Sequence, residues 1–184
     1  KNDVVIQDTA WEGYEEIPSW IMQGYSTMAD EANEQFEERP THVFVQAGVG
    51  SLAGSVVGYF SNKYSDNPPI MCVVEAEPAA CLYKGALAGD GEIRTCSGEM
   101  PTIMAGLCCG EPNITSWDIL KNHVTAFLAV DDSIARKGMR MLNAPLKGDP
   151  QVISGESGAA TFGTLATIMQ DDSYTIIPLY IKGF

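Results

Sequence analysis

The stretch THVFVQAGVGSLAG, residues Thr41–Gly54, joins a short apolar run to a cluster of small residues. Val43–Val45 is the kind of apolar run that a buried parallel strand needs, and glycines follow it before a segment of helix-compatible composition, Ser55–Tyr64. The pattern therefore predicts a strand, a glycine loop and a helix in direct succession.

A loop of this composition is suited to bind an anion. Small residues let the backbone approach a ligand closely, and a helix that starts there directs free N–H groups and its positive dipole end at the ligand. The spacing matches neither a dinucleotide fingerprint nor G-x-x-x-x-G-K-S/T, because no Lys or Thr follows Gly54. We therefore expect a mononucleotide-sized or cofactor phosphate rather than ATP or NAD. The alternative is a tight turn that binds nothing.

The composition limits the class of protein. With 184 residues, 45% of them hydrophobic, the chain can bury a core, and its formal net charge of −13 disfavours nucleic acid and anionic membranes as partners. No window holds the roughly 18 uninterrupted apolar residues of a membrane span. The polar first residues are also unlike a secretory signal, so we expect a cytoplasmic protein.

Cysteines and histidines follow no metal-binding spacing. The five cysteines include no C-x-x-C pair, and the two histidines, His42 and His123, lie far apart in the sequence. We therefore expect no metal site and buried free thiols, with the alternative that one pair of thiols meets in space.

Strands and helices alternate along the rest of the chain. Further strands are predicted at Val4–Gln7, Ile70–Glu75 and Val124–Val130, and helices at Pro18–Glu38, Glu77–Leu87, Thr115–His123, Ser133–Leu142 and Ala160–Met169. The first of these helices is amphipathic, and its aromatic and Met side chains, including Trp20, Met28 and Phe36, are expected in the core. The alternation predicts an α/β fold, a three-layer sandwich in which a mostly parallel sheet carries helices on both faces.

Asp8 is the first candidate for a functional carboxylate. It follows the predicted strand Val4–Gln7, where a parallel strand would deliver side chains to a cleft. The alternative is that Asp8, directly or through Thr9, caps a helix that starts near Trp11.

The last residues, Asp171–Phe184, do not complete another strand–helix unit. Pro178 would confine any strand at Thr175–Ile177 to an edge of the sheet. We therefore expect residues 1–170 to form one α/β domain, residues 171–184 to be a divergent or truncated tail, and the polypeptide to be part of a larger fold.

Six segments together resemble the diaminopropionate ammonia-lyases, which are pyridoxal-phosphate (PLP) enzymes of the tryptophan synthase β-like fold, fold type II. They are Gln7–Tyr14 (QDTAWEGY), Trp20–Tyr25 (WIMQGY), Gln46–Gly50 (QAGVG), Thr102–Leu107 (TIMAGL), Cys109–Pro112 (CGEP) and Ser154–Ala159 (SGESGA). The TIMAGL segment recurs across the wider superfamily, whereas QDTAWEGY and CGEP point to the narrower family. The resemblance covers residues 4 to about 170 in order.

The resemblance implies roles for single residues. The loop would bind the PLP phosphate through backbone N–H groups, in agreement with the anion site expected above, and its residues are Gly48, Val49, Gly50, Ser51 and Leu52. Asp8 would be a catalytic residue, as an acid/base or as the partner of a substrate ammonium group. Ser154–Ala159 would lie near the cofactor, and Cys81 and Cys109 would flank the cleft as a thiol pair able to approach or oxidise.

The implied activity is that of a carbon–nitrogen lyase that converts a small amino acid, 2,3-diaminopropionate, to pyruvate and ammonia by α,β-elimination and acts as a homodimer. The family's Schiff-base lysine would lie in a segment before residue 1, so we expect this polypeptide alone to be inactive. Two alternatives stay open: a PLP enzyme resembling serine and threonine dehydratases, and a non-catalytic anion-binding remnant of the fold.

Overall fold

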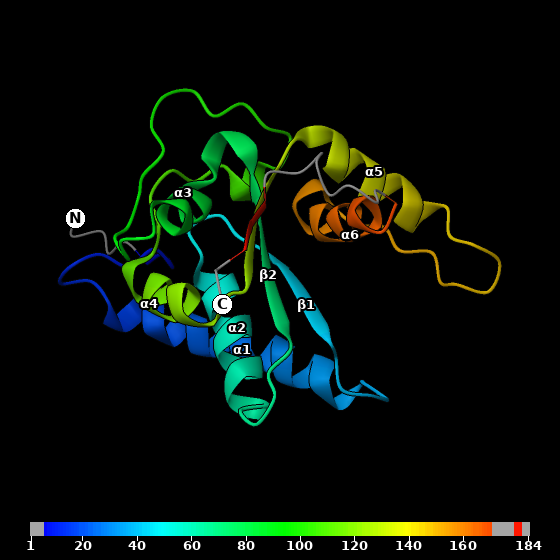
Figure 1. The fold of residues 1–184 in the computed structure, drawn as a ribbon, viewed down its shortest axis with the longest axis horizontal. Helices are drawn as coiled ribbons and strands as arrows, with labels where there is room; N and C mark the ends of the chain where they lie inside the picture. The colour runs from blue at the N-terminus through cyan, green and yellow to red at the C-terminus, as the bar shows by residue number, and fades with distance from the viewer. Residues whose placement is uncertain (1–5, 171–178, 182–184) are drawn as a thin grey trace.

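The computed structural model describes residues 6–170 and 179–181 of the chain (Figure 1). Its elements, with η for a 3-10 turn, are α1 (Glu16–Glu34), β1 (His42–Gln46), α2 (Ser51–Lys63), β2 (Ile70–Ala76), η1 (Glu77–Ala79), α3 (Cys81–Ala88), η2 (Ala105–Leu107), α4 (Ile114–His123), β3 (Ala126–Val130), α5 (Asp132–Asn143), α6 (Glu156–Ile168) and β4 (Leu179–Ile181). The strands and helices predicted between residues 41 and 170 are therefore present with bounds that differ by a few residues, except that the predicted helix Glu77–Leu87 is a 3-10 turn, η1, followed by α3.

The strands form one sheet in the order β1-β2-β3-β4. β1 pairs with β2 and β2 with β3 in parallel, whereas β4 is antiparallel to β3. In the register, Val45 lies opposite Val73, and Val73 lies opposite Phe127. This confirms the mostly parallel sheet. It also brings the carboxyl ends of β1, β2 and β3 to the same edge, where the loops that follow them meet.

Helices cover both faces of the sheet, which confirms the three-layer sandwich. Side chains alternate along the strands, so Val73 of β2 packs into a core with α2 and α4, while Val74 packs into a second core with α5 and α6. Figure 1 shows α1, α2 and α4 on one side of the sheet and the α5–α6 pair on the other. All four residues of β2 from Met71 to Val74 are buried, as expected for a parallel strand covered on both faces.

The segment around Asp8 differs from its prediction. Of the predicted strand Val4–Gln7, the structure describes only the last two residues, and they are not in a strand. No helix starts near Trp11 either, because Trp11 and Tyr14 close a turn by pairing with each other, and α1 begins at Glu16. The alternative that Asp8 or Thr9 caps a helix there is therefore wrong.

Helix α1 is shorter and less buried than predicted. It ends at Glu34 rather than near Glu38, and Trp20, Met28 and Phe36 are exposed instead of lying in the core. The helix lies on the outside of α2 and buries only a narrow stripe that includes Met22 and Ala29. A single neighbouring layer cannot cover the whole apolar face that the sequence pattern suggested.

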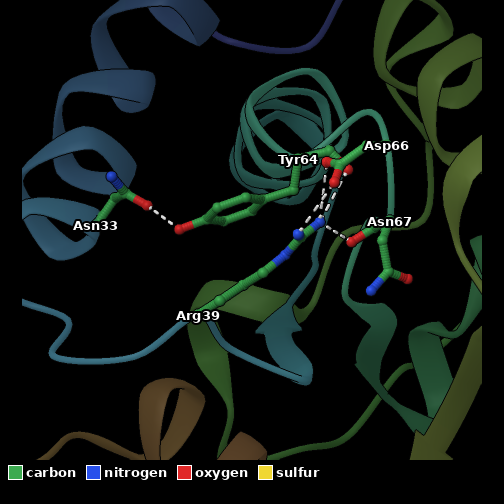
Figure 2. A network of polar contacts seen from close by, with 5 residues as sticks. All are labelled: Asn33, Arg39, Tyr64, Asp66 and Asn67. Atoms are coloured by element: carbon green, nitrogen blue, oxygen red, sulfur yellow. Dashed lines mark hydrogen bonds and ion pairs between the residues drawn. The ribbon is translucent and has the colours of Figure 1, made fainter.

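Arg39, which precedes β1, binds the turn that connects α2 to β2. Arg39 donates to the carbonyl oxygens of Tyr64 (3.3 Å) and Asn67, forms an ion pair with Asp66 (3.3 Å), and lies 4.4 Å above the Tyr64 ring (Figure 2). The Tyr64 hydroxyl in turn donates to Asn33 of α1 at 2.5 Å. A cation here also complements the carboxyl end of the α2 dipole.

The predicted boundary at residue 170 stays a prediction, because residues 171–178 and 182–184 lie outside the described part of the chain. In the ranges that the structure does describe, no helix has the length and apolarity needed to cross a membrane.

Candidate functional site

The glycine loop connects β1 to α2 at the carboxyl edge of the sheet. Gly50 occupies the N-cap position with φ +100°, and α2 begins at Ser51, earlier than the predicted Ser55. The first main-chain bond of the helix runs from Gly54 N to Gly50 O (2.7 Å), so the N–H groups of Ser51, Leu52 and the next residue have no partner within the helix. Among the residues that the structure describes, no side chain caps this end of α2.

Two glycines of the loop leave no room for a side chain. A Cβ atom on Gly48 would lie 2.9 Å from the Gly106 carbonyl oxygen, and one on Gly50 would lie 2.7 Å from Ser116 Oγ. The positive φ of Gly50 also favours glycine for conformational reasons. Packing against two other segments therefore fixes the path of the loop.

The loop lines a cavity of about 260 Å³. Residues 46–52 form one wall, and the other lining residues are Asp8, Tyr25, Gly106, Leu107, Cys109 and Ser157. The structure thus brings Asp8 and the predicted phosphate-binding residues, Gly48 to Leu52, to one cavity. The last two residues of the TIMAGL segment, Gly106 and Leu107, also line the cavity.

Asp8 is held at the cavity by its main chain. Its carbonyl oxygen accepts hydrogen bonds from Ser51 Oγ and from Asn113 Nδ2, both at 2.6 Å. Its carboxylate accepts from the Tyr25 hydroxyl at 3.4 Å. Burial raises the pKa of Tyr25, and the Asp8 charge and hydrogen bond raise it further, so Tyr25 keeps its proton and remains a donor.

Asn113 is a buried residue of the site region that the sequence analysis missed. Its side-chain oxygen accepts from Ser116 N at 2.9 Å and caps α4, which begins at Ile114, one residue before the predicted Thr115. An Asn placed directly before an apolar helix is itself an N-cap signal that would have identified this function. The bonds that Asn113 makes to Asp8 and Ser51 join residues far apart in the chain, and no local pattern reports them.

Cys81 and Cys109 do approach each other, but not through their thiols. Cys81 Sγ lies 3.5 Å from the carbonyl oxygen of Cys109, and both are free cysteines. Burial raises the pKa of Cys81 to about 12 and also raises the pKa of Cys109, so both thiols are protonated at neutral pH. Only Cys109 lines the cavity.

The segment Ser154–Ala159, expected near the cofactor, reaches the cavity by one residue. Helix α6 starts within this segment at Glu156, and Ser157 in its first turn lines the cavity. Ser154 is not among the lining residues, and its hydroxyl bonds to the next main-chain carbonyl, that of Gly155, at 3.1 Å.

The residues present fit the phosphate of PLP. The loop offers N–H groups at a helix N-terminus, and its glycines keep the cradle open where a Cβ atom would fill it. These donors suit an anion, while the Asp8 carboxylate on the same cavity suits a cationic group of a substrate. The backbone of Gly48 to Leu52 would hold the phosphate.

Several known proteins are similar to this chain in sequence and structure. The family described as "Pyridoxal-phosphate dependent enzyme" matches residues 8–175. The diaminopropionate ammonia-lyase of Salmonella typhimurium is 53% identical over 179 residues, which make up 95% of this chain and 44% of that protein. A crystal structure of the Escherichia coli diaminopropionate ammonia lyase in complex with an aminoacrylate-PLP azomethine reaction intermediate has a TM-score of 0.82 at 51% identity, covering 89% of this chain and 42% of that one.

A more distant structure shares the fold alone. The processed form of threonine deaminase isoform 2 from Solanum lycopersicum has a TM-score of 0.69 at 17% identity, covering 82% of this chain and 39% of that one. The chain spans less than half of the length of the diaminopropionate ammonia-lyases that it matches. Because the family match extends over most of the described residues and includes the whole glycine loop, the chain belongs to the family of pyridoxal-phosphate dependent enzymes, with the fold type II architecture.

Proposed function

We propose that the protein carrying this chain is a PLP-dependent ammonia-lyase that converts 2,3-diaminopropionate to pyruvate and ammonia. The observation that supports this most directly is the cavity shared by the uncapped start of α2 after the glycine loop and the Asp8 carboxylate. The 53% identity to the Salmonella enzyme supports the choice of substrate within the family.

Two groups of cavity-lining residues have separate roles in the proposed reaction. The N–H groups of Gly48 to Leu52 bind the PLP phosphate and orient the cofactor, which, when bound, withdraws electrons from the substrate Cα. Asp8 binds a substrate ammonium group or exchanges a proton there, and the Tyr25 hydroxyl keeps the carboxylate in place. A substrate with two amino groups offers a positive charge to Asp8 in addition to the amino group that reacts with the cofactor.

Turnover by the full-length gene product tests the proposal. We expect ammonia and pyruvate from 2,3-diaminopropionate, with a kcat/KM well above that for serine and threonine. A clear preference for serine or threonine would replace the proposed substrate and support the dehydratase alternative. PLP binding without turnover of any of these amino acids would support the anion-binding remnant instead.

We also infer that the protein acts as a homodimer in the cytoplasm. The family resemblance supports the dimer, and the free state of all five cysteines fits a reducing compartment. Light scattering on the full-length protein and fractionation of the source cells test these two statements, and a monomer or an exported protein would contradict them.

A further inference from the structure

Asn113 and Ser51 form a buried polar cluster between the glycine loop and residues 6–10, called here the Asp8 segment. Asn113 Nδ2 donates to Asp8 O at 2.6 Å and to Ser51 Oγ at 2.8 Å, and Ser51 Oγ donates to the same Asp8 oxygen at 2.6 Å. Asn113 is fully buried and Ser51 is 1% exposed. The three groups close a triangle of short hydrogen bonds, in which the Asn113–Ser51 bond is buried and the two bonds to Asp8 are part-buried, so each is costly to lose.

The same asparagine also fixes the glycine loop. Its main-chain N–H donates to the carbonyl oxygen of Val49 at 2.7 Å, while its side-chain oxygen accepts from Ser116 N. One residue thus joins the Asp8 segment, the loop and the starts of α2 and α4. Each hydrogen-bonding group of the Asn113 side chain has a partner, so its amide has one preferred orientation.

The Asp8 segment has few other attachments to the site. Residues 6–10 are in neither a helix nor a strand, so no regular main-chain ladder holds them. Their other contacts are weaker: Ile114 N bonds to Ala10 O at 3.3 Å, and Gln7 N bonds to the Tyr14 hydroxyl at 3.2 Å. The two bonds that the Asp8 carbonyl oxygen accepts are therefore the shortest that hold this residue, and the Tyr25 hydroxyl adds a longer bond of 3.4 Å to its carboxylate.

From this geometry we propose that Asn113 and the Ser51 hydroxyl are positioning residues that set the Asp8 carboxylate relative to the phosphate-binding loop. Ser51 then has two roles: its N–H would bind the phosphate, and its hydroxyl holds the Asp8 carbonyl oxygen. This inference rests on the proposed roles of Asp8 and the loop. It goes beyond them by naming the groups that make the two parts of the site one rigid unit.

The test compares Ser51→Ala with Ser55→Ala in the full-length protein. Ser55 lies one helical turn further along α2 and also donates to a main-chain carbonyl at 2.6 Å, but that carbonyl belongs to Met22. Ser51→Ala leaves the backbone N–H intact, so we expect PLP affinity to change less than about threefold while kcat falls about tenfold, since small displacements of catalytic groups are costly. Ser55→Ala should leave kcat unchanged. Equal kcat values for the two variants, or a loss confined to PLP affinity, would overturn the proposal.

A second measurement does not depend on activity. Amide hydrogen exchange of residues 6–12, with and without PLP, should become about tenfold faster in Ser51→Ala and faster still in Asn113→Ser, but not in Ser55→Ala, because the lost bonds lower the local opening free energy. Asn113→Ser keeps a residue that can cap α4 but is too short to reach Asp8. Unchanged exchange in Ser51→Ala would overturn the proposal even if Asn113→Ser failed to fold. If the wild-type protein turned over none of the amino acids tested, the proposed function would fail while the exchange result still decided the positioning role.

Discussion

The two ends of helix α2 are built in opposite ways. At its carboxyl end, the main-chain oxygen of Tyr64 accepts from Arg39, whose guanidinium also stacks on the Tyr64 ring and pairs with Asp66 (Figure 2). At its amino end, no described side chain caps the first amides. The hydroxyl of Ser51, the first residue of the helix, donates to the Asp8 carbonyl oxygen instead. One end satisfies its polar groups within the protein, and the other leaves them facing a cavity.

The two ends of α2 are therefore expected to have different roles, the carboxyl end in stability and the amino end in ligand binding. Arg39 does not line the cavity, and its contacts hold the loop before β1 to the turn before β2. The uncapped amides at the start of α2 add no intramolecular hydrogen bonds to the stability of the free protein. Solvent or a ligand satisfies such N–H groups instead. Substitutions at the two ends should therefore affect different measurements.

The largest effect is expected at the amino end. Gly48→Ala places a Cβ 2.9 Å from the Gly106 carbonyl and 3.4 Å from Leu107 Cα, and neither backbone atom can move without opening the cavity wall. We expect PLP affinity to fall by about 1,000-fold or more, equivalent to about 4 kcal/mol. Titration of the full-length apoprotein with PLP, followed by absorbance, measures it. Gly58→Ala in the same helix is the control, because its Cβ would meet only Ile119 at 3.7 Å; a similar loss there would contradict the steric explanation.

The buried carboxyl group of Glu75, near the carboxyl end of β2, should make the stability of the protein depend on pH. Glu75 is fully buried and accepts from Leu82 N (2.9 Å) and Tyr83 N (2.7 Å) at the start of α3, and burial raises its pKa to about 8. The folded state therefore holds this proton more tightly than the unfolded state. We expect the free energy of unfolding to fall by a few kcal/mol as pH rises from about 4.5 to about 8, at about 1.4 kcal/mol for each unit of pKa shift.

Chemical denaturation at a series of pH values measures this dependence. Glu75→Gln removes the titrating group, so its stability should change less with pH over the same window than that of the wild type. Arg39→Met is the matched control at the carboxyl end of α2 and should keep the wild-type slope. An unchanged slope in Glu75→Gln would show that another group is responsible.

A smaller effect is expected at the carboxyl end of α2. Arg39→Met removes the hydrogen bonds to two carbonyl groups and the contact with the Tyr64 ring, and we expect a loss of about 1–2 kcal/mol in the free energy of unfolding. PLP affinity should stay within twofold of wild type, roughly the resolution of such a titration. Urea denaturation and the same PLP titration measure the two quantities. A loss of PLP affinity would show that the two ends are coupled.

The smallest effect is expected from Tyr64→Phe. The substitution removes only the hydroxyl bond to Asn33 at 2.5 Å and keeps the ring below Arg39. We expect a loss of about 0.5–1 kcal/mol, the net value of one hydrogen bond. Urea denaturation beside Arg39→Met separates the contribution of the ring from that of the hydroxyl, and a loss as large as that of Arg39→Met would contradict this division.

The sequence predicted the central sheet and the glycine loop well because both depend on neighbours in the chain. The apolar run before Gly48 and the small residues after it already define a strand, a turn and a helix. The same approach failed for Trp20 and Met28, whose spacing suggested a buried face that the structure exposes, because helical periodicity does not say how much of a face its neighbours cover.

The sequence by itself determined which stretch is the candidate phosphate-binding loop, since the glycines of Thr41–Gly54 permit the positive φ of Gly50 and a close approach of the backbone. Only the tertiary structure decided where the Asp8 carboxylate lies. Its position depends on Asn113, which is 105 residues away, and on Ser51, which is 43 residues away. Hydrogen bonds between such distant residues form only after the sheet has brought its carboxyl edge together, so no local pattern of residues encodes them.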